Sequence, residues 1–288
     1  NIVKSIFQSE ELPNKVILIT SVQSILMILL SMLLLKFYSN NSASLILGIS
    51  FGYLIPILPY IKSFSSNVIF EKNTKKIQAF FNYGAPLSIW LGISISLNFL
   101  DRYFIEYYFG SSLMGSYAGF SEFIIRIFSI VIFPITLAVH PILMNKWNKN
   151  KNISDSLSAL FQASLLQILI CIFMLIPLLI FKDFIFSFIQ AIIPQLDNSM
   201  KGIMIPIFLG GFLWQLALVL HKPLEIEERT LTMVGCIMFS LVINIIGNLF
   251  FLPIFGIIAT AYTMIISAFT YIIFSILLSK TFISIFSK

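Results

Sequence analysis

The chain has 288 residues, of which 58% are hydrophobic and only 10% are charged, and its mean hydropathy is +0.98. Soluble proteins carry about 25% charged residues, so this composition excludes an ordinary soluble domain. The net charge of +6 comes from basic residues dispersed along the chain, which excludes the clustered patch of a nucleic-acid-binding protein.

Apolar runs of about 18 residues or more recur along the whole chain, which is the pattern of membrane-spanning helices. The predicted spans are 16–35, 44–61, 84–100, 113–139, 157–181, 202–220, 231–252 and 254–279. Their lengths suit tilted helices that cross a hydrocarbon core of ~30 Å. We therefore predict an all-α integral membrane protein with about eight transmembrane helices.

The segments between the spans differ in character. Residues 62–80 form the longest polar stretch and are typical of a linker between two helical bundles. Residues 182–200 carry an apolar run that is too short to span, so we expect a short surface helix there. The connection at 252–256 is predicted to be a tight turn.

Basic residues predict the orientation of the spans. When the connections are read alternately, 13 of the 18 basic residues fall on one side and four on the other, with Arg126 alone inside a span. The four are Lys36, Arg102, Lys182 and Lys201. The positive-inside rule then places the side with 13 in the cytoplasm, together with both ends of this chain.

No pattern of residues indicates catalysis. Cys171 and Cys236 lie inside apolar spans, which argues against a disulfide framework or a cysteine metal site. His140 and His221 are isolated near membrane edges, and we expect ordinary packing or interface roles for both. Phosphate-binding glycine loops and catalytic triads are absent from the sequence. We expect no enzyme activity, no catalytic residues, no cofactor and no metal.

Several short motifs are similar to those of Wzx-type polysaccharide (O-antigen) flippases. They occur in the family's order across residues 80–288, with weaker similarity before that. The motifs are Gly84–Leu87, Asp101–Tyr103, Gly110, Gly115–Tyr117, His221–Leu224 with Arg229–Thr230, Asn244–Asn248, Leu252–Gly256 and Ala259–Ala261.

The resemblance implies the fold of the multidrug/oligosaccharidyl-lipid/polysaccharide exporters, in which two six-helix bundles face each other across a central cavity. Residues 1–62 would then be the last two helices of an incomplete N-terminal bundle, 63–79 a cytoplasmic linker, and 80–288 the C-terminal six-helix bundle. We expect four helices of the first bundle to be missing from this chain.

Charged residues inside apolar runs are the candidate site. Glu122 and Arg126 are spaced i, i+4 on one predicted helix, so they can pair. Either they form an internal ion pair that fixes packing, or their face lines the cavity and Arg126 meets an anionic group of the substrate. Asp101 and Arg102 are equally compatible with an interfacial anchor and with a gate contact.

Asn244 and Asn248 are also spaced i, i+4, and are candidates for polar residues of the cavity. For these two the more ordinary role is hydrogen bonding between helices.

Three functions follow from these patterns. The first is flipping of undecaprenyl-diphosphate-linked oligosaccharide across the cytoplasmic (inner) membrane of a bacterium, for O-antigen (lipopolysaccharide) or capsule synthesis. The second is cation-coupled export of small amphipathic compounds by the same fold. The third, a membrane-embedded enzyme of polysaccharide assembly, is disfavoured because no large outer loop or interfacial carboxylate pair is present. The expected partners are the lipid-linked oligosaccharide, membrane lipids and, as the resemblance allows, the polysaccharide polymerase machinery, with no nucleic acid.

Overall fold

A computed structural model describes residue 7 and residues 13–60, 74–150 and 153–286 of the chain. These residues form helices joined by short connections, with no strand among them. Within the described ranges, eight helical segments are long and apolar enough to cross a membrane. They are Ile17–Phe37, Ser42–Tyr60, Ile77–Phe109, Ser111–Val131, Leu157–Ile180, Met200–Ile226, Thr230–Phe255 and Ile257–Leu278. The predicted all-α membrane class and the predicted number of about eight spans are confirmed.

The chain divides into two compact units, Asn1–Asn73 and Thr74–Lys288. This boundary falls within the predicted linker 63–79, of which residues 63–73 lie outside the described residues. The remainder of that linker, from Thr74 onward, is the start of a long helix. The assignment of the first unit to an incomplete bundle stays a prediction.

The first unit contains a helical hairpin of α2 (Pro13–Phe37) and α3 (Ser42–Leu54), followed by the short helix η1 (Ile55–Ile57). Gly48 of α3 lies directly against the backbone of Ser31 in α2, where a Cβ atom would be 2.4 Å from the Ser31 Cα. Small residues let membrane helices approach this closely, and dispersion contacts then hold them together. Close packing of α2 against α3 thus holds the hairpin together.

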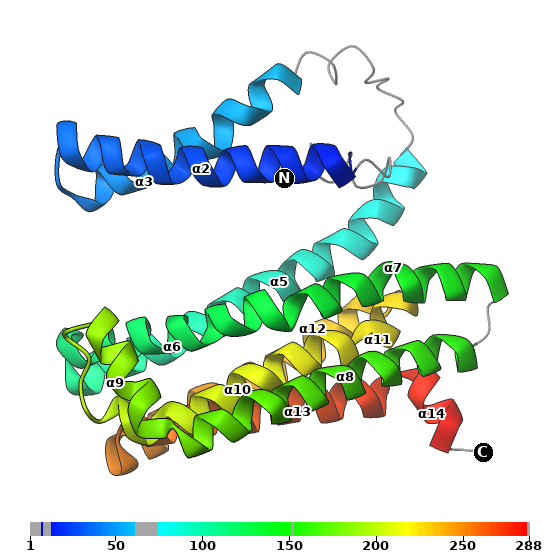
Figure 1. The fold of residues 1–288 in the computed structure, drawn as a ribbon. Helices are drawn as coiled ribbons and strands as arrows, with labels where there is room; N and C mark the ends of the chain where they lie inside the picture. Colours follow the sequence, from blue (N-terminus) through cyan, green and yellow to red (C-terminus); the bar gives the residue numbers. More distant parts are fainter. Residues whose placement is uncertain (1–6, 8–12, 61–73, 151–152, 287–288) are drawn as a thin grey trace. The chain divides into compact units, whose positions relative to one another are not determined.

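The described residues of the second unit, 74–150 and 153–286, form ten helices. They are α5 (Thr74–Phe109), α6 (Ser111–Val131), α7 (Phe133–Asn150), α8 (Ile153–Ile180), α9 (Lys182–Ile192), α10 (Met200–Leu220), α11 (Lys222–Ile226), α12 (Thr230–Phe255), α13 (Ile257–Leu278) and α14 (Lys280–Phe286). The long helices run side by side, with α9 at one end of this bundle and α11 and α14 at the other (Figure 1). We call these the α9 end and the α14 end.

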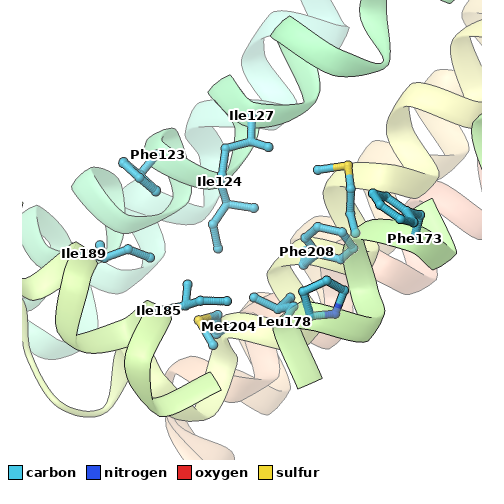
Figure 2. Close-up of a pocket in the computed structure, with 11 residues that line it drawn as sticks. Phe123, Ile124, Ile127, Phe173, Leu178, Ile185, Ile189, Met204 and Phe208 are labelled. Atoms are coloured by element: carbon cyan, nitrogen blue, oxygen red, sulfur yellow. The ribbon is translucent and has the colours of Figure 1, made fainter. Parts of the chain in front are cut away.

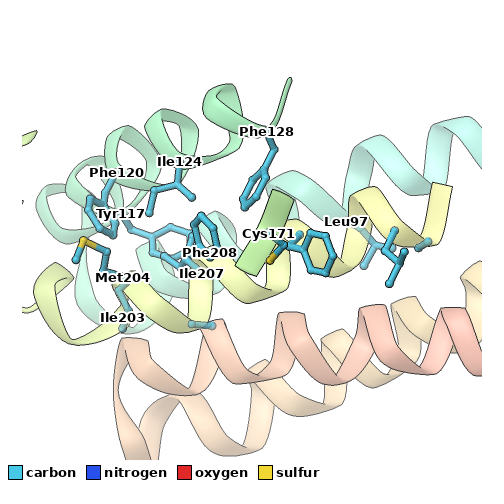
Figure 3. Packing of buried hydrophobic residues seen from close by; sticks show 14 of the residues in the cluster. Leu97, Tyr117, Phe120, Ile124, Phe128, Cys171, Ile203, Met204, Ile207 and Phe208 are labelled. Atoms are coloured by element: carbon cyan, nitrogen blue, oxygen red, sulfur yellow. The ribbon is translucent and has the colours of Figure 1, made fainter. Parts of the chain in front are cut away.

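The centre of this bundle is α10, which packs against α6, α7, α8 and α13. In its most apolar 18-residue window 61% of residues are buried, against 39% or less in every other candidate span. Figure 3 shows the core beside it, where Phe120, Ile124 and Phe128 of α6 point toward α10, which carries Met204 and Phe208. The Phe128 and Phe208 rings lie 4.8 Å apart, so aromatic packing fixes α6 against α10.

Two predicted span boundaries were wrong. The third span does not end at residue 100, because α5 continues to Phe109 and keeps Asp101 and Arg102 inside the helix. The predicted fourth span, 113–139, is divided between α6 and α7 at Ile132. Pro134 accounts for this break, since proline lacks the N–H of a helical hydrogen bond and lies here in the first turn of α7, where that N–H is not needed.

Two predicted connections are present. The expected short helix after residue 182 is α9, which buries Phe186 and Ile189. The turn predicted at 252–256 is shorter than expected, because α12 continues through Phe255 and the chain turns at Gly256, whose φ of +69° favours glycine.

Glu227, between α11 and α12, fixes the start of α14. Its carboxylate accepts hydrogen bonds from the Thr281 backbone N–H (2.8 Å), the Thr281 hydroxyl (2.6 Å), the Ser279 hydroxyl (2.7 Å) and the Lys280 backbone N–H (3.1 Å). The first N–H groups of a helix lack partners within it, so this carboxylate stabilises α14 where it begins.

Candidate functional site

Three charged residues of α5 and α6 form an ion-pair chain that we call the Arg–Glu–Arg triad. Arg102 Nη2 lies 2.7 Å from Glu122 Oε1, and Arg126 Nη2 lies 3.5 Å from Glu122 Oε2. The i, i+4 pair of Glu122 and Arg126 that the sequence predicted is therefore present. The stronger partner of Glu122, however, is Arg102 on the neighbouring helix.

The triad carries a surplus positive charge, because two guanidinium groups share one carboxylate. The Arg102 side chain is 20% exposed and that of Arg126 is 75% exposed. The Arg102 guanidinium also lies over the Phe99 ring at 4.7 Å, and its buried Nε has no hydrogen-bond partner among the described residues. Charged residues within membrane spans usually face water or a polar partner, so we expect Arg126 to face one of these and not lipid.

Asp101 belongs to a second, buried cluster. Its side chain accepts hydrogen bonds from the Tyr117 hydroxyl of α6 (3.2 Å) and from the Asn248 amide of α12 (3.0 Å). The same amide also donates to the Asn244 side-chain oxygen (3.1 Å), and the Thr260 hydroxyl of α13 donates to Asn248 Oδ1 (2.8 Å). This Asp101 cluster joins α5, α6, α12 and α13.

The Asp101 carboxylate has hydrogen-bond donors around it but no ion-pair partner in the described part of the chain. Asp101 is 4% exposed, Asn244 is 1% exposed, and Asn248 and Thr260 are fully buried. A buried carboxylate without an opposite charge is costly, by several kcal/mol, and binding a proton or a cation removes that cost. The side-chain oxygens gathered here are ligands of the type that hard cations prefer.

Asp101 and Arg102 have different environments although they are consecutive. Successive residues of a helix are about 100° apart around its axis, so one side chain points into the bundle and the other toward Glu122. The sequence placed both at the outer end of a helix, but α5 continues for two further turns. It also missed Tyr117 and Thr260, which carried no signal except their places in the family-like motifs.

A third cluster lies toward the α14 end and was missed altogether. Both histidines approach one carboxylate, since His140 Nδ1 and His221 Nε2 each lie 3.9 Å from Glu225. Lys222 Nζ lies 2.5 Å from the same carboxylate. The i, i+4 spacing of His221 and Glu225 was the available signal. The two histidines are isolated in the sequence, but the structure brings both of them to Glu225.

His221 is held from its other side by aromatic residues. Tyr271 contacts His221 Nδ1 through its hydroxyl at 3.2 Å, and Trp90 donates to that hydroxyl at 2.8 Å. The Trp90 and His221 rings meet edge to face at 5.0 Å. All three side chains are buried, so they fasten α5 and α13 to the end of α10.

The described residues include no group of three or more His, Cys, Asp or Glu side chains able to hold a metal ion. Comparisons with known proteins add no identification: no protein-family model matches the chain, and no significant match exists among curated proteins or solved structures. The resemblance to polysaccharide flippases therefore rests on the sequence motifs alone.

Proposed function

We propose that this chain serves as a flippase, which moves a polyprenyl-diphosphate-linked oligosaccharide across the cytoplasmic membrane of a bacterium for O-antigen or capsule synthesis. The observation that carries the proposal is the surplus positive charge of the Arg–Glu–Arg triad within the membrane spans. A diphosphate is the anionic part of such a lipid, and planar guanidinium groups bind phosphate oxygens in a bidentate manner.

The two arginines of the triad differ in their pairing with Glu122, and this difference supports the proposal. Glu122 pairs with Arg102 at 2.7 Å, whereas Arg126 is more distant at 3.5 Å and is mostly exposed. Arg102 thus neutralises the carboxylate, and Arg126 keeps donors free for a ligand. In our proposed orientation the α14 end is cytoplasmic, which follows from the excess of basic residues in its connections.

Replacement of Arg126 tests the proposal. Arg126→Ala removes a charged hydrogen-bond partner of phosphate, a contact worth about 1.5–3 kcal/mol, so transport should fall at least about tenfold. Arg126→Lys keeps the charge but loses the planar fork, and should be partly active. The assay is restoration of surface polysaccharide in a strain that lacks its flippase, with protein level measured in the same cells.

Lys201→Ala is the matched control, because it also removes a cation from an ion pair. Lys201 pairs with the exposed Asp183 at 2.9 Å near the α9 end, away from the triad. This variant should restore polysaccharide as well as the unmodified chain does. Full restoration by Arg126→Ala at normal protein level would overturn the role that we assign to the triad.

The Asp101 cluster favours a second candidate, cation-coupled export of small amphipathic compounds. A carboxylate buried without an ion-pair partner is suited to exchanging a proton or an alkali cation during transport. The same coupling is compatible with a flippase, so the two candidate functions are distinguished by the substrate that the chain transports. Resistance to amphipathic cationic dyes in cells making this chain, without restored polysaccharide, would favour the exporter.

A further inference from the structure

An apolar groove lies beside the triad on the same helix. It is bounded by α6, α8, α9 and α10 and has a volume of about 290 Å³. Figure 2 shows Phe123 and Ile127 of α6 on one wall, Phe173 of α8 and Phe208 of α10 on the other, and Ile185 of α9 between them. Every side chain that lines the groove is apolar.

The groove and the triad occupy neighbouring sectors of α6. Glu122 and Arg126 are one helical turn apart, and the groove residues Phe123 and Ile127 follow each of them by one residue. A shift of one residue rotates a side chain by about 100°, so the charged face and the apolar face adjoin along α6. A ligand that covers both faces has an anionic group joined to a hydrocarbon chain.

The position of Arg126 along α6 bears on the kind of lipid. Arg126 lies 15 residues after the start of α6 and five residues before its end, which is about 22 Å and about 8 Å along the helix. The headgroup of a bilayer phospholipid stays at the membrane surface, outside a hydrocarbon core that is ~30 Å thick. The head of a lipid that is carried through the membrane would pass along α6 and reach Arg126 on the way.

We propose that the groove holds part of the isoprenoid chain of a polyprenyl diphosphate while its diphosphate contacts the triad. This inference rests on the proposed flippase function and adds a site for the hydrocarbon part of the substrate. Lipid tails are as apolar as the groove, so the groove adds selectivity by shape, and most of the affinity comes from the charged head.

Photocrosslinking tests the occupant. The full chain is placed in nanodiscs of phosphatidylethanolamine and phosphatidylglycerol, with a polyprenyl diphosphate that carries a diazirine on its chain. The probe should label peptides from 123–127 and 173–178, and unlabelled polyprenyl diphosphate should compete. A phosphatidylglycerol probe with a diazirine on its acyl chain should label these peptides at least fivefold less. Equal labelling by the two probes would show an ordinary lipid-filled surface and overturn the proposal.

Variants that fill the groove sharpen the test. Ile127→Trp should lower labelling at least fivefold, whereas Ile130→Trp, at a position 76% exposed on the same helix, should leave it within twofold. Ile185→Trp, with Phe184→Trp as its control, repeats the comparison on α9 if Ile127→Trp fails to fold. Unchanged labelling in a folded groove variant overturns the inference.

The flippase proposal and the groove inference fail in different ways. Selective labelling in a chain that does not restore polysaccharide would support the groove and count against the flippase function. Restored polysaccharide with unselective labelling would count against the groove alone.

Discussion

Asp101 lies inside the bundle with hydrogen-bond donors on two sides and Arg102 turned away toward Glu122. The folded protein is therefore less stable with the charged Asp101 than it would be with a neutral side chain of the same shape. The amide of asparagine has that shape: its single oxygen can accept the hydrogen bond from Asn248, and its NH2 group can donate to the oxygen of the Tyr117 hydroxyl. Selection for stability alone does not explain a carboxylate here, which is why we assign it a coupling role.

The Asp101→Asn variant should consequently melt at the same temperature as the unmodified chain or higher, by about 2–4 °C for each kcal/mol of relieved desolvation. Its transport should be lost or uncoupled. Thermal unfolding of the purified protein in detergent, followed by the polysaccharide assay, measures both effects. Tyr117→Phe is the control, since it removes a donor and leaves the charge, and it should lower the melting temperature. A large fall for Asp101→Asn would mean that Asp101 is a structural group.

Residue-level prediction worked where a contact was local in sequence. The i, i+4 spacing of Glu122 and Arg126 is enough to predict their pairing, because helix geometry alone brings them together. Contacts such as Arg102–Glu122 and Tyr117–Asp101 depend on the rotation of α5 against α6. That rotation depends on packing across the whole bundle, so no local sequence pattern predicts it.

Among the helices, α12 and α13 approach each other closely at one glycine. A Cβ atom on Gly247 would lie 2.5 Å from Thr263 Cγ2 and 3.1 Å from Thr263 Cβ. Thr263 is buried and β-branched, so it has little freedom to move away. The same helix carries Asn248 at the next position, and the spacing of the two helices fixes the bond from Thr260 to Asn248.

We expect Gly247→Ala to destabilise the protein by about 1–3 kcal/mol through overpacking. Gly235→Ala is the matched control on the same helix, because a Cβ there meets open space, and it should be neutral or stabilising by up to about 1 kcal/mol. Melting temperatures of the two purified variants give the comparison. If both variants melt alike, the close approach of α12 and α13 is not what limits their packing.

At the α14 end, Glu227 makes the docking of a short helix dependent on pH. Burial alone raises the pKa of the Glu227 carboxyl, but the hydrogen bonds from Thr281, Ser279 and Lys280 outweigh it and hold the pKa below its ordinary value. A lowered pKa means that the ionised form stabilises the folded state. This contribution is fully present above the unfolded pKa of about 4.3 and is lost as pH falls through the lower, folded value.

Backbone amides of Lys280 and Thr281 should therefore be protected from hydrogen exchange at neutral pH, and should lose protection only below about pH 4. Exchange is measured relative to the intrinsic rate at each pH, which removes the pH dependence of exchange itself. Glu227→Gln weakens the acceptor, so these amides should exchange faster at neutral pH and show little further change on acidification. An acid response that survives in Glu227→Gln would assign the effect to another group.

Element-level prediction succeeded for the number of spans and was weaker for their ends. Hydropathy identifies a span because lipid requires about 20 apolar residues in sequence. It places the end of α5 too early because Asp101, Arg102 and Glu106 lower the average, although the first two face partners inside the bundle. A charged residue that finds a partner inside the protein does not end a helix, and sequence averages cannot register this.

For the whole molecule, the order of helices constrains which connections share a side of the membrane. The start of α6 and the connection from α9 to α10 lie at the same end of the second unit, and the end of α7 lies at the opposite end with α11 and α14 (Figure 1). Ser112 and Asn198 are exposed at the first of these ends. Gln78, near the start of α5, belongs to the same side as Lys146 because one crossing out and one crossing back separate them.

The distribution of basic residues then predicts which side is which. In a background with Cys171→Ala and Cys236→Ala, the variants Ser112→Cys and Asn198→Cys should react with a membrane-impermeant maleimide added to intact cells. Gln78→Cys and Lys146→Cys should react only after the cells are permeabilised, because the side of the membrane with 13 basic residues is the cytoplasmic side by the positive-inside rule. Each variant serves as a control for the others, since Ser112 and Asn198 must agree if α6–α7 and α8 each cross once. Labelling of Gln78→Cys in intact cells would contradict the proposed orientation, in which the α14 end is cytoplasmic.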